Sequence, residues 1–282
     1  MGVEEFHYQV PWRSRGSQPG HHRGTSAGGG FEFRGHASLL DAPDPRRVDV
    51  QASLRHPFEE IVMRVYTQRS AIPVYLIADL SASMGFEGYS RKLDVLSDFS
   101  ASLGYSAYRT GDPFAFIGCD SVVRTEFFQP LTRTRTAGHR VSARLRDFVP
   151  DASNSRGMLE APALIGKSRS LIFLCSDFHF SLQLTGQILT ALAYHTVVPI
   201  VLWDTMELTV PATGIAAFRE AETGRRRTVW LRSSYRQRIH RAFAERRQNL
   251  VDYFLAFGLT PLFILDRFDA GDVTRYFYER AG

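Results

Sequence analysis

The chain has 282 residues, of which 44% are hydrophobic, and it carries a formal net charge of +5. This length is sufficient for one large or two small domains with a buried core. No apolar run reaches the roughly 18 residues that a membrane-spanning helix requires. The first residues also lack the basic-then-apolar pattern of a signal peptide. We therefore expect a cytoplasmic protein without a membrane span.

The chain contains only two cysteines, Cys119 and Cys175, and each lies at the end of an apolar run. Two cysteines at this separation do not form the ligand pattern of a zinc site. We expect two free, buried thiols, which agrees with a reducing compartment.

Residues 1–70 are expected to form a loop and a small β-rich appendage. Residues 13–30 are rich in Gly, Ser, Pro and His, which is typical of a flexible loop. After this segment, short runs of β-branched and aromatic residues predict strands. These runs cover residues 31–33, 48–50 and 61–66.

From residue 71 onward, apolar runs alternate with amphipathic segments, which predicts a second domain over 71–282. Its predicted strands are 72–80, 113–119, 122–128, 170–176, 197–203 and 261–265. Its predicted helices are 91–108, 138–148, 158–165, 181–194, 235–257 and 270–280. Asp269 is the expected N-cap of the last helix. Residues 208–231 contain two strand-like segments and predict a β-hairpin extension.

Apolar strands that alternate with helices predict a mostly parallel α/β sheet with helices on both faces. In sheets of this kind, ligands bind at the carboxyl ends of the strands, where the strand order reverses. Asp79 and Asp177 each follow a predicted strand. We therefore expect the geometry to bring these two carboxylates together.

The most informative segment is residues 74–84, in which an apolar strand ends in Asp79, Ser81 and Ser83. One carboxylate and two hydroxyls on a tight turn form an oxygen-lined nest. Hard divalent cations such as Mg2+ prefer oxygen ligands. The alternative is a strand that ends in an Asp-Ser turn without a metal.

The Asp-x-Ser-x-Ser spacing resembles the metal-ion-dependent adhesion site of von Willebrand factor A domains. The resemblance implies that Asp79 anchors a cation, often through water, and that Ser81 and Ser83 ligate it directly. It also implies that a carboxylate from a partner protein completes the coordination shell. The implied cation is Mg2+, with Mn2+ and Ca2+ as alternatives.

The same resemblance requires two further residues from other parts of the chain. Asp177 fits the role of an aspartate that follows the next central strand. The usual threonine of an intervening loop is missing, and the loop offers Ser153 and Ser155 in its place. The predicted metal ligands are Asp79, Ser81, Ser83, Ser153, Ser155 and Asp177.

A more specific resemblance lies upstream, in residues 41–55 (DAPDPRRVDVQASLR). This segment is similar to the pattern G-D-D-P-R-x-I-D-W-x-A-S-A-R of the domain-of-unknown-function family 58. The matching residues are Asp44, Pro45, Arg46, Asp49, Ala52, Ser53 and Arg55. Ala42 and Pro43 replace the Gly-Asp pair and Val50 replaces the Trp, which suggests a divergent branch such as the MxaS-like group.

The family 58 resemblance covers residues 31–200 and implies a von Willebrand A-like fold. It also implies a MoxR-type AAA+ ATPase as partner, because members of the family are typically encoded beside one. The implied function is that of a non-enzymatic, metal-dependent adaptor or chaperone-like protein. The pair would assist maturation of a client, or insertion of its metal; for the MxaS-like branch the implied client is a methanol dehydrogenase.

Enzymatic functions are the competing class. A metal-assisted hydrolase could use Asp79, Ser81, Ser83 and Asp177, and a serine hydrolase could add His179 as the base. No G-x-S-x-G elbow is present for the latter. Residues 161–168 match a loose phosphate-loop pattern, but a helix-like segment precedes them and a strand follows, which is the reverse of the required order.

The basic residues are almost all arginine, since Lys92 and Lys167 are the only lysines among 34 basic residues. Nine arginines form a dense tract, opposed only by Glu245. They are Arg225, Arg226, Arg227, Arg232, Arg236, Arg238, Arg241, Arg246 and Arg247. The tract predicts a solvated helix face, a docking surface for an acidic partner or a nucleic-acid surface. No aromatic-rich nucleic-acid motif accompanies it, so we do not expect nucleic-acid binding.

Overall fold

The computed structural model describes residues 4–12, 19–40, 45–58, 60–208, 214–219, 226–231 and 233–280. The chain divides into two compact units. One unit comprises residues 9–72. The other comprises residues 73–282 together with the N-terminal residues 1–8, and it is called the α/β unit below.

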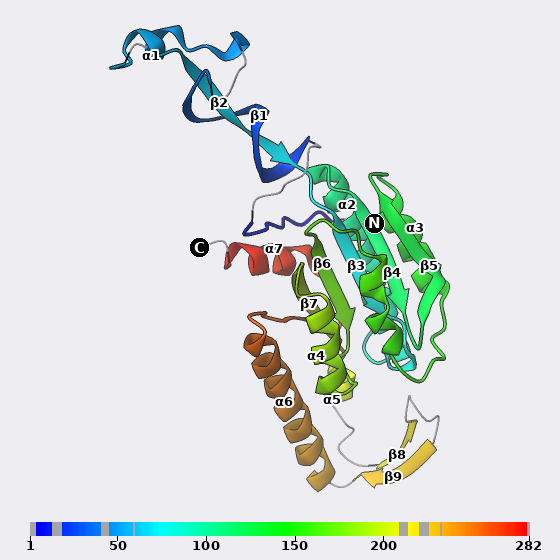
Figure 1. Cartoon of the computed structure of the whole chain (residues 1–282). Helices are drawn as coiled ribbons and strands as arrows, with labels where there is room; N and C mark the ends of the chain where they lie inside the picture. Colours follow the sequence, from blue (N-terminus) through cyan, green and yellow to red (C-terminus); the bar gives the residue numbers. More distant parts are fainter. Residues whose placement is uncertain are drawn as a thin grey trace. The chain divides into compact units, whose positions relative to one another are not determined.

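The α/β unit is built on a six-stranded sheet with the order β10-β7-β6-β3-β4-β5 (Figure 1). The strands are β3 (Val74–Asp79), β4 (Phe114–Cys119), β5 (Val123–Thr132), β6 (Leu171–Ser176), β7 (Thr196–Trp203) and β10 (Leu262–Leu265). All neighbouring pairs are parallel except β4 and β5. The mostly parallel α/β sheet predicted from the sequence is thus confirmed.

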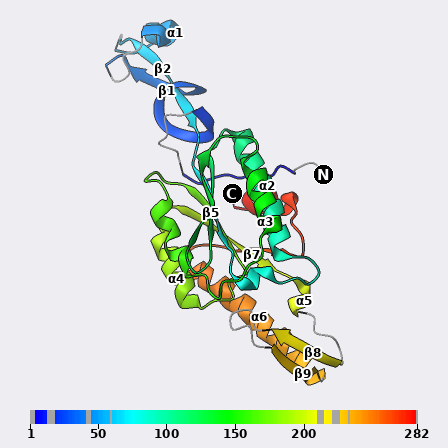
Figure 2. The ribbon, with the colours of Figure 1, turned by 90° about the vertical axis from the view of Figure 1, so that its right-hand side faces the viewer.

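Helices cover both faces of this sheet (Figure 2). They are α2 (Lys92–Thr110), α3 (Ala137–Asp147), α4 (Leu182–Ala191), α5 (Thr205–Leu208), α6 (Ser233–Ala256) and α7 (Ala270–Tyr278). One face packs apolar strand residues such as Ile77 and Leu174 against Ile188 of α4 and Phe254 of α6. The helix α7 begins at the predicted N-cap, where the Asp269 side chain accepts hydrogen bonds from two backbone amides.

The opposite face is built around aromatic rings. Phe99 of α2 lies 5.6 Å from Phe173 of β6, and Phe277 of α7 lies 6.0 Å from the same ring. The N-terminal residues add Phe6, whose ring stacks on Phe99 at 5.8 Å and is only 1% exposed. Residues 4–8 therefore contribute to the core of the α/β unit.

The strand order reverses beside β3, since the chain runs from β3 to β4 on one side and later returns to β6 on the other. Ligands of open α/β sheets bind at such a reversal, outside the carboxyl ends of the strands. Asp79 ends β3 and Ser176 ends β6. The fold thus places the two predicted site segments at one edge.

The unit of residues 9–72 contains a long antiparallel pair, β1 (Pro19–Ser38) and β2 (Val62–Ser70), with several register shifts. It also contains the short helices η1 (Pro45–Arg47) and α1 (Val50–Leu54). The Asp49 side chain caps α1 by accepting from the Ala52 amide at 3.0 Å, and it also accepts from Arg64 at 2.8 Å. Of the residues that match the family 58 pattern, Asp44 lies outside the described residues.

Three local predictions were wrong. Residues 19–30 belong to β1 rather than to a loop, because they pair with β2. The strand predicted at 48–50 is replaced by the start of α1, because Asp49 acts as an N-cap there. The helix predicted over 158–165 is two short 3-10 helices, η3 (Arg156–Leu159) and η4 (Ala161–Leu164), and Pro162 within the second prevents a continuous α-helix.

The prediction of two free, buried cysteines was correct. Cys119 and Cys175 are both free and buried. The extension contains the antiparallel strands β8 (Gly214–Arg219) and β9 (Arg226–Leu231). None of the helices in the described residues combines the length and the apolar character needed to cross a membrane.

Candidate metal-binding site

The Asp79 carboxylate is the centre of the candidate site. It is fully buried at the end of β3, and it accepts hydrogen bonds from the Ser81 amide at 2.9 Å and from Ser176 Oγ at 2.7 Å. Ser155 Oγ lies 3.0 and 2.9 Å from its two oxygens. All of these donors are uncharged, so in the described part of the chain no cationic side chain is bonded to Asp79.

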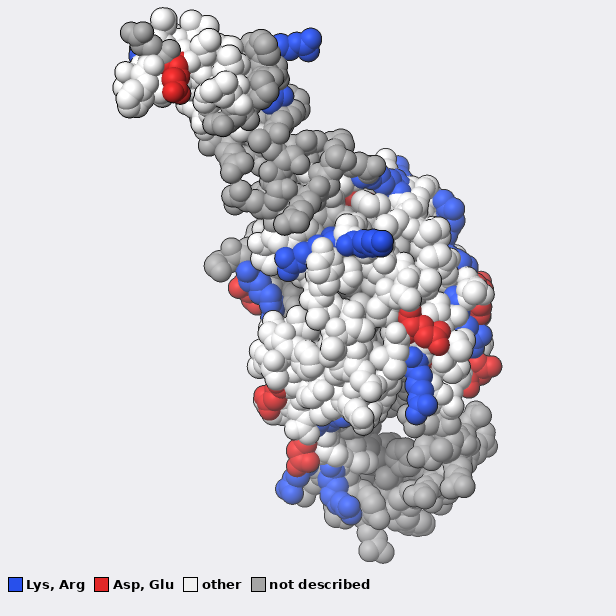
Figure 3. Space-filling view, in the orientation of Figure 1, with Lys and Arg blue, Asp and Glu red and all other residues white. Residues whose placement is uncertain are grey.

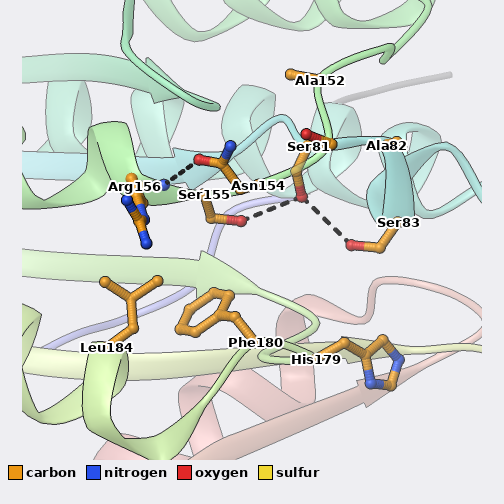
Figure 4. A pocket seen from close by; sticks show the side chains of 11 residues that line it. Ser81, Ala82, Ser83, Ala152, Asn154, Ser155, Arg156, His179, Phe180 and Leu184 are labelled. Atoms are coloured by element: carbon orange, nitrogen blue, oxygen red, sulfur yellow. Dashed lines mark hydrogen bonds between the residues drawn. The ribbon is translucent and has the colours of Figure 1, made fainter. Parts of the chain in front are cut away.

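The hydroxyls of Ser81, Ser83 and Ser155 lie close to one another (Figure 4), and together with the Asp79 carboxylate they are called the oxygen cluster below. Ser81 Oγ lies 3.2 Å from Ser155 Oγ and 3.3 Å from Ser83 Oγ. Neighbouring ligands in an octahedron around Mg2+ lie about 3.0 Å apart, given metal–oxygen distances of about 2.1 Å. The spacing and the purely oxygen donor set therefore fit a small hard cation with little rearrangement.

The structure separates the two serines of the intervening loop. Ser155 is 3% exposed and joins the oxygen cluster, whereas Ser153 is exposed and lies on the wall of the pocket. Gly157 fixes this loop: its amide donates to Asp120 O at 2.8 Å, and an added Cβ would lie 2.2 Å from the Val122 backbone. Of the two serines that the loop offers in place of a threonine, Ser155 is thus the one that contacts Asp79.

Asp177 lies beside the oxygen cluster but makes different contacts. Its Oδ2 accepts from Lys92 Nζ at 2.9 Å and its Oδ1 accepts from the His179 amide at 3.1 Å. Lys92 also donates to Glu207 Oε1 at 2.6 Å, and its side chain is only 2% exposed. Asp177 therefore has an internal cationic partner, which Asp79 lacks.

The two carboxylates have opposite pKa shifts. Burial, and then the nearby charge of Asp177, raise the pKa of Asp79 to about 6. Burial would also raise the pKa of Asp177, but the charges of His179 and Lys92 outweigh it and hold that pKa below its ordinary value. Likewise, burial opposes the charge on Lys92, but Asp177 and Glu207 raise its pKa above the ordinary value.

Asp177, His179 and Glu207 form a second group with atoms of metal-ligand type within 4.8 Å of one another. The Lys92 ammonium already lies between the two carboxylates of this group. The His179 ring stacks on Trp203, with Nε2 3.4 Å from Glu207 Oε1. Within the described residues, no hydrogen bond joins His179 to Ser81 or Ser83.

The pocket over the oxygen cluster has a mixed lining. Its rim includes Asn154, Arg156, His179, Phe180 and Leu184 (Figure 4). On the face shown in Figure 3, the charged side chains are scattered, with acidic groups among the basic ones.

The arginine tract is only partly available to a partner. The guanidinium of Arg246 donates to Phe180 O at 2.6 Å, and that of Arg247 lies 4.1 Å from the centre of the Phe263 ring. The side chains of Arg225, Arg226, Arg227, Arg232 and Arg236 lie outside the described residues.

Sequence reasoning missed Lys92, Glu207 and the contact of Ser176 with Asp79. Lys92 is one of two lysines in the chain, and this rarity was the only feature of the sequence that could have drawn attention to it. Glu207 carries no motif, and its role depends on the position of α5 next to the start of α2.

Comparison with known families identifies the chain. The profile of the "Protein of unknown function DUF58" family matches residues 43–249. The chain belongs to the DUF58 family. No curated protein matches it.

Several solved structures resemble this DUF58 protein at low identity. BatB from Bacteroides thetaiotaomicron is 11% identical, with 75% of this chain and 99% of that chain covered and a TM-score of 0.42. The vWF domain of the pilus tip protein Mfa5 from Porphyromonas gingivalis is 20% identical, with 38% of each chain covered and a TM-score of 0.30. Mussel byssus proximal thread matrix protein 1, in a structure with a zinc-occupied MIDAS motif, is 17% identical, with 47% of this chain covered and a TM-score of 0.33. This chain spans only 38% of the mussel protein.

Proposed function

We propose that this DUF58 protein is a non-enzymatic, cation-dependent protein-interaction module. The oxygen cluster of Asp79, Ser81, Ser83 and Ser155 would hold a divalent cation, with Mg2+ as the first candidate. A bound cation supplies an open coordination position for an acidic side chain of a partner protein. The observation that carries this proposal is the close grouping of one buried carboxylate and three hydroxyls beneath a surface pocket.

The partner and client follow from the family resemblance. We propose a MoxR-type AAA+ ATPase as the partner, and a client protein whose maturation or metal insertion the two assist, such as methanol dehydrogenase. The two free thiols support action in a reducing compartment such as the cytoplasm.

A metal-assisted hydrolase is the competing function. A serine nucleophile needs a base within hydrogen-bonding distance. The His179 imidazole instead lies beside Glu207 and on Trp203, which supports the non-enzymatic proposal against a serine hydrolase. Turnover by the purified protein that disappears in Asp79→Ala would favour the hydrolase.

The test uses two serines of the same loop. Tagged wild type, Ser155→Ala and Ser153→Ala are used to pull down partners from native extract, in Mg2+ and then in EDTA. We expect the wild type to recover a MoxR-type ATPase in Mg2+ but not in EDTA. Ser155→Ala should fail to recover it in either buffer, because Ser155 alone of the two serines contacts Asp79. Equal recovery of the same proteins in both buffers would contradict the proposal. Loss in Ser153→Ala but not in Ser155→Ala would contradict the assigned site.

A further inference from the structure

Lys92 is a buried lysine next to the candidate cation site. It is the first residue of α2, its side chain is 2% exposed, and its Nζ contacts Asp177 and Glu207 at 2.9 and 2.6 Å. The ammonium also lies 5.6 Å from the centre of the Phe86 ring. Lysines are almost never fully buried unless they are paired, so this position requires its carboxylate partners.

The ion pair gives the two site aspartates different charge environments. Both oxygens of Asp177 are engaged, one by Lys92 and one by the His179 amide. Among the residues that the structure describes, Asp79 accepts only from hydroxyls and an amide. Of the two carboxylates at this edge of the sheet, Asp79 is therefore the one that offers an unbalanced negative charge to a cation.

We propose that Lys92, which is shared between Asp177 and Glu207, is an internal counter-ion that reduces the negative charge of Asp177, so that a cation bound at Asp79 keeps a net positive charge and binds an acidic group. This inference rests on the proposed function and deepens it. A divalent cation with Asp79 alone retains one positive charge, whereas a free Asp177 beside it would cancel that charge. Attraction for a partner carboxylate is then strong only while Lys92 holds Asp177.

This role makes Lys92 a positioning and specificity-determining residue rather than a ligand. Removal of its charge is expected to have two opposite effects. The freed Asp177 should strengthen binding of the cation itself, while the more neutral site should bind a carboxylate less well. Replacement of a purely structural lysine would not strengthen cation binding and weaken carboxylate binding at the same time.

The test measures Mn2+ binding to the full chain by electron paramagnetic resonance, and acetate binding to the Mn2+-loaded protein by water proton relaxation. We expect Lys92→Met to bind Mn2+ about tenfold more tightly or better, and acetate about tenfold more weakly. Lys92→Arg retains the charge and should restore wild-type behaviour. Lys167→Met changes the other lysine, which is exposed, and serves as the matched control. Unchanged or weaker Mn2+ binding by folded Lys92→Met overturns the inference.

A second measurement does not depend on the folding of a variant. With two lysines in the chain, lysine-selective 15N labelling gives two ammonium signals in NMR spectra. We expect the Lys92 signal to stay protected from solvent exchange when Mg2+ is added, because the ion pair with Asp177 persists. Release of Lys92 on Mg2+ addition would overturn the inference. If the wild type binds neither Mn2+ nor Mg2+, the proposed function itself fails. This outcome is distinct from the two that overturn the inference about Lys92, in both of which the wild type still binds the cation.

Discussion

The raised pKa of Asp79 makes cation binding at the oxygen cluster depend on pH. Below about 6 the buried carboxyl is protonated, and a proton then competes with the cation for the same oxygens. For one competing proton and a pKa of about 6, the apparent dissociation constant should be about tenfold higher at pH 5 than at pH 7. An aspartate with an ordinary pKa of about 3.9 would change it by only about 10% over the same range. The size of the pH effect therefore reports the burial of Asp79.

The assay is an Mn2+ titration by electron paramagnetic resonance at pH 5, 6 and 7. Burial opposes the charge on His179, but Asp177 and Glu207 raise its pKa above the ordinary value, so its positive charge also increases as the pH falls. A His179→Gln variant removes this contribution and should keep the loss of affinity between pH 6 and 5. Asp79→Asn should bind Mn2+ weakly at every pH. An apparent affinity that stays within about twofold from pH 7 to pH 5 would refute the reasoning.

Two further predictions concern the parts of the α/β unit that support the site. Phe6→Ala should lower the free energy of unfolding of this unit by about 3–5 kcal/mol, because it empties a buried aromatic position. The control His7→Ala changes an exposed neighbour and should leave stability nearly unchanged. Urea unfolding measures both variants, and equal effects would contradict the packing described. Gly157→Ala should weaken Mn2+ binding about tenfold or more, because its Cβ collides with the Val122 backbone and displaces the loop that carries Ser155. A wild-type affinity for Mn2+ in this variant would contradict the prediction, because it would show that the loop accommodates the added Cβ.

Part of the site could be predicted from local sequence. The local sequence was sufficient to predict Asp79, Ser81 and Ser83 as site residues, because the apolar strand and the turn that carries these side chains follow one another directly in the chain. Asp177 was also placed at the correct edge of the sheet, since parallel strands end on the same side. The assignment of these residues as metal ligands stays a prediction.

The choice between Ser153 and Ser155 could not be made from sequence, because both have the same chemistry. The tertiary contacts of the loop, including the close approach of Gly157 to Val122, place the Ser155 hydroxyl at Asp79. Lys92 was missed for a similar reason. Its partner Asp177 is 85 residues away, and no local pattern reports a contact at that distance along the chain.

The sequence by itself determined the alternation of strands and helices, the apolar strand interiors and the carboxylate and hydroxyl chemistry at the end of β3. These features depend on side-chain periodicity and composition within short segments, which the chain carries locally. Only the tertiary structure decided which distant side chains meet: Ser155 with Asp79, Lys92 with Asp177, and Phe6 with the core beneath β6. The physical reason is that the strand order β6-β3-β4 places the ends of β3 and β6 side by side, and this order arises from long-range packing rather than from any one segment.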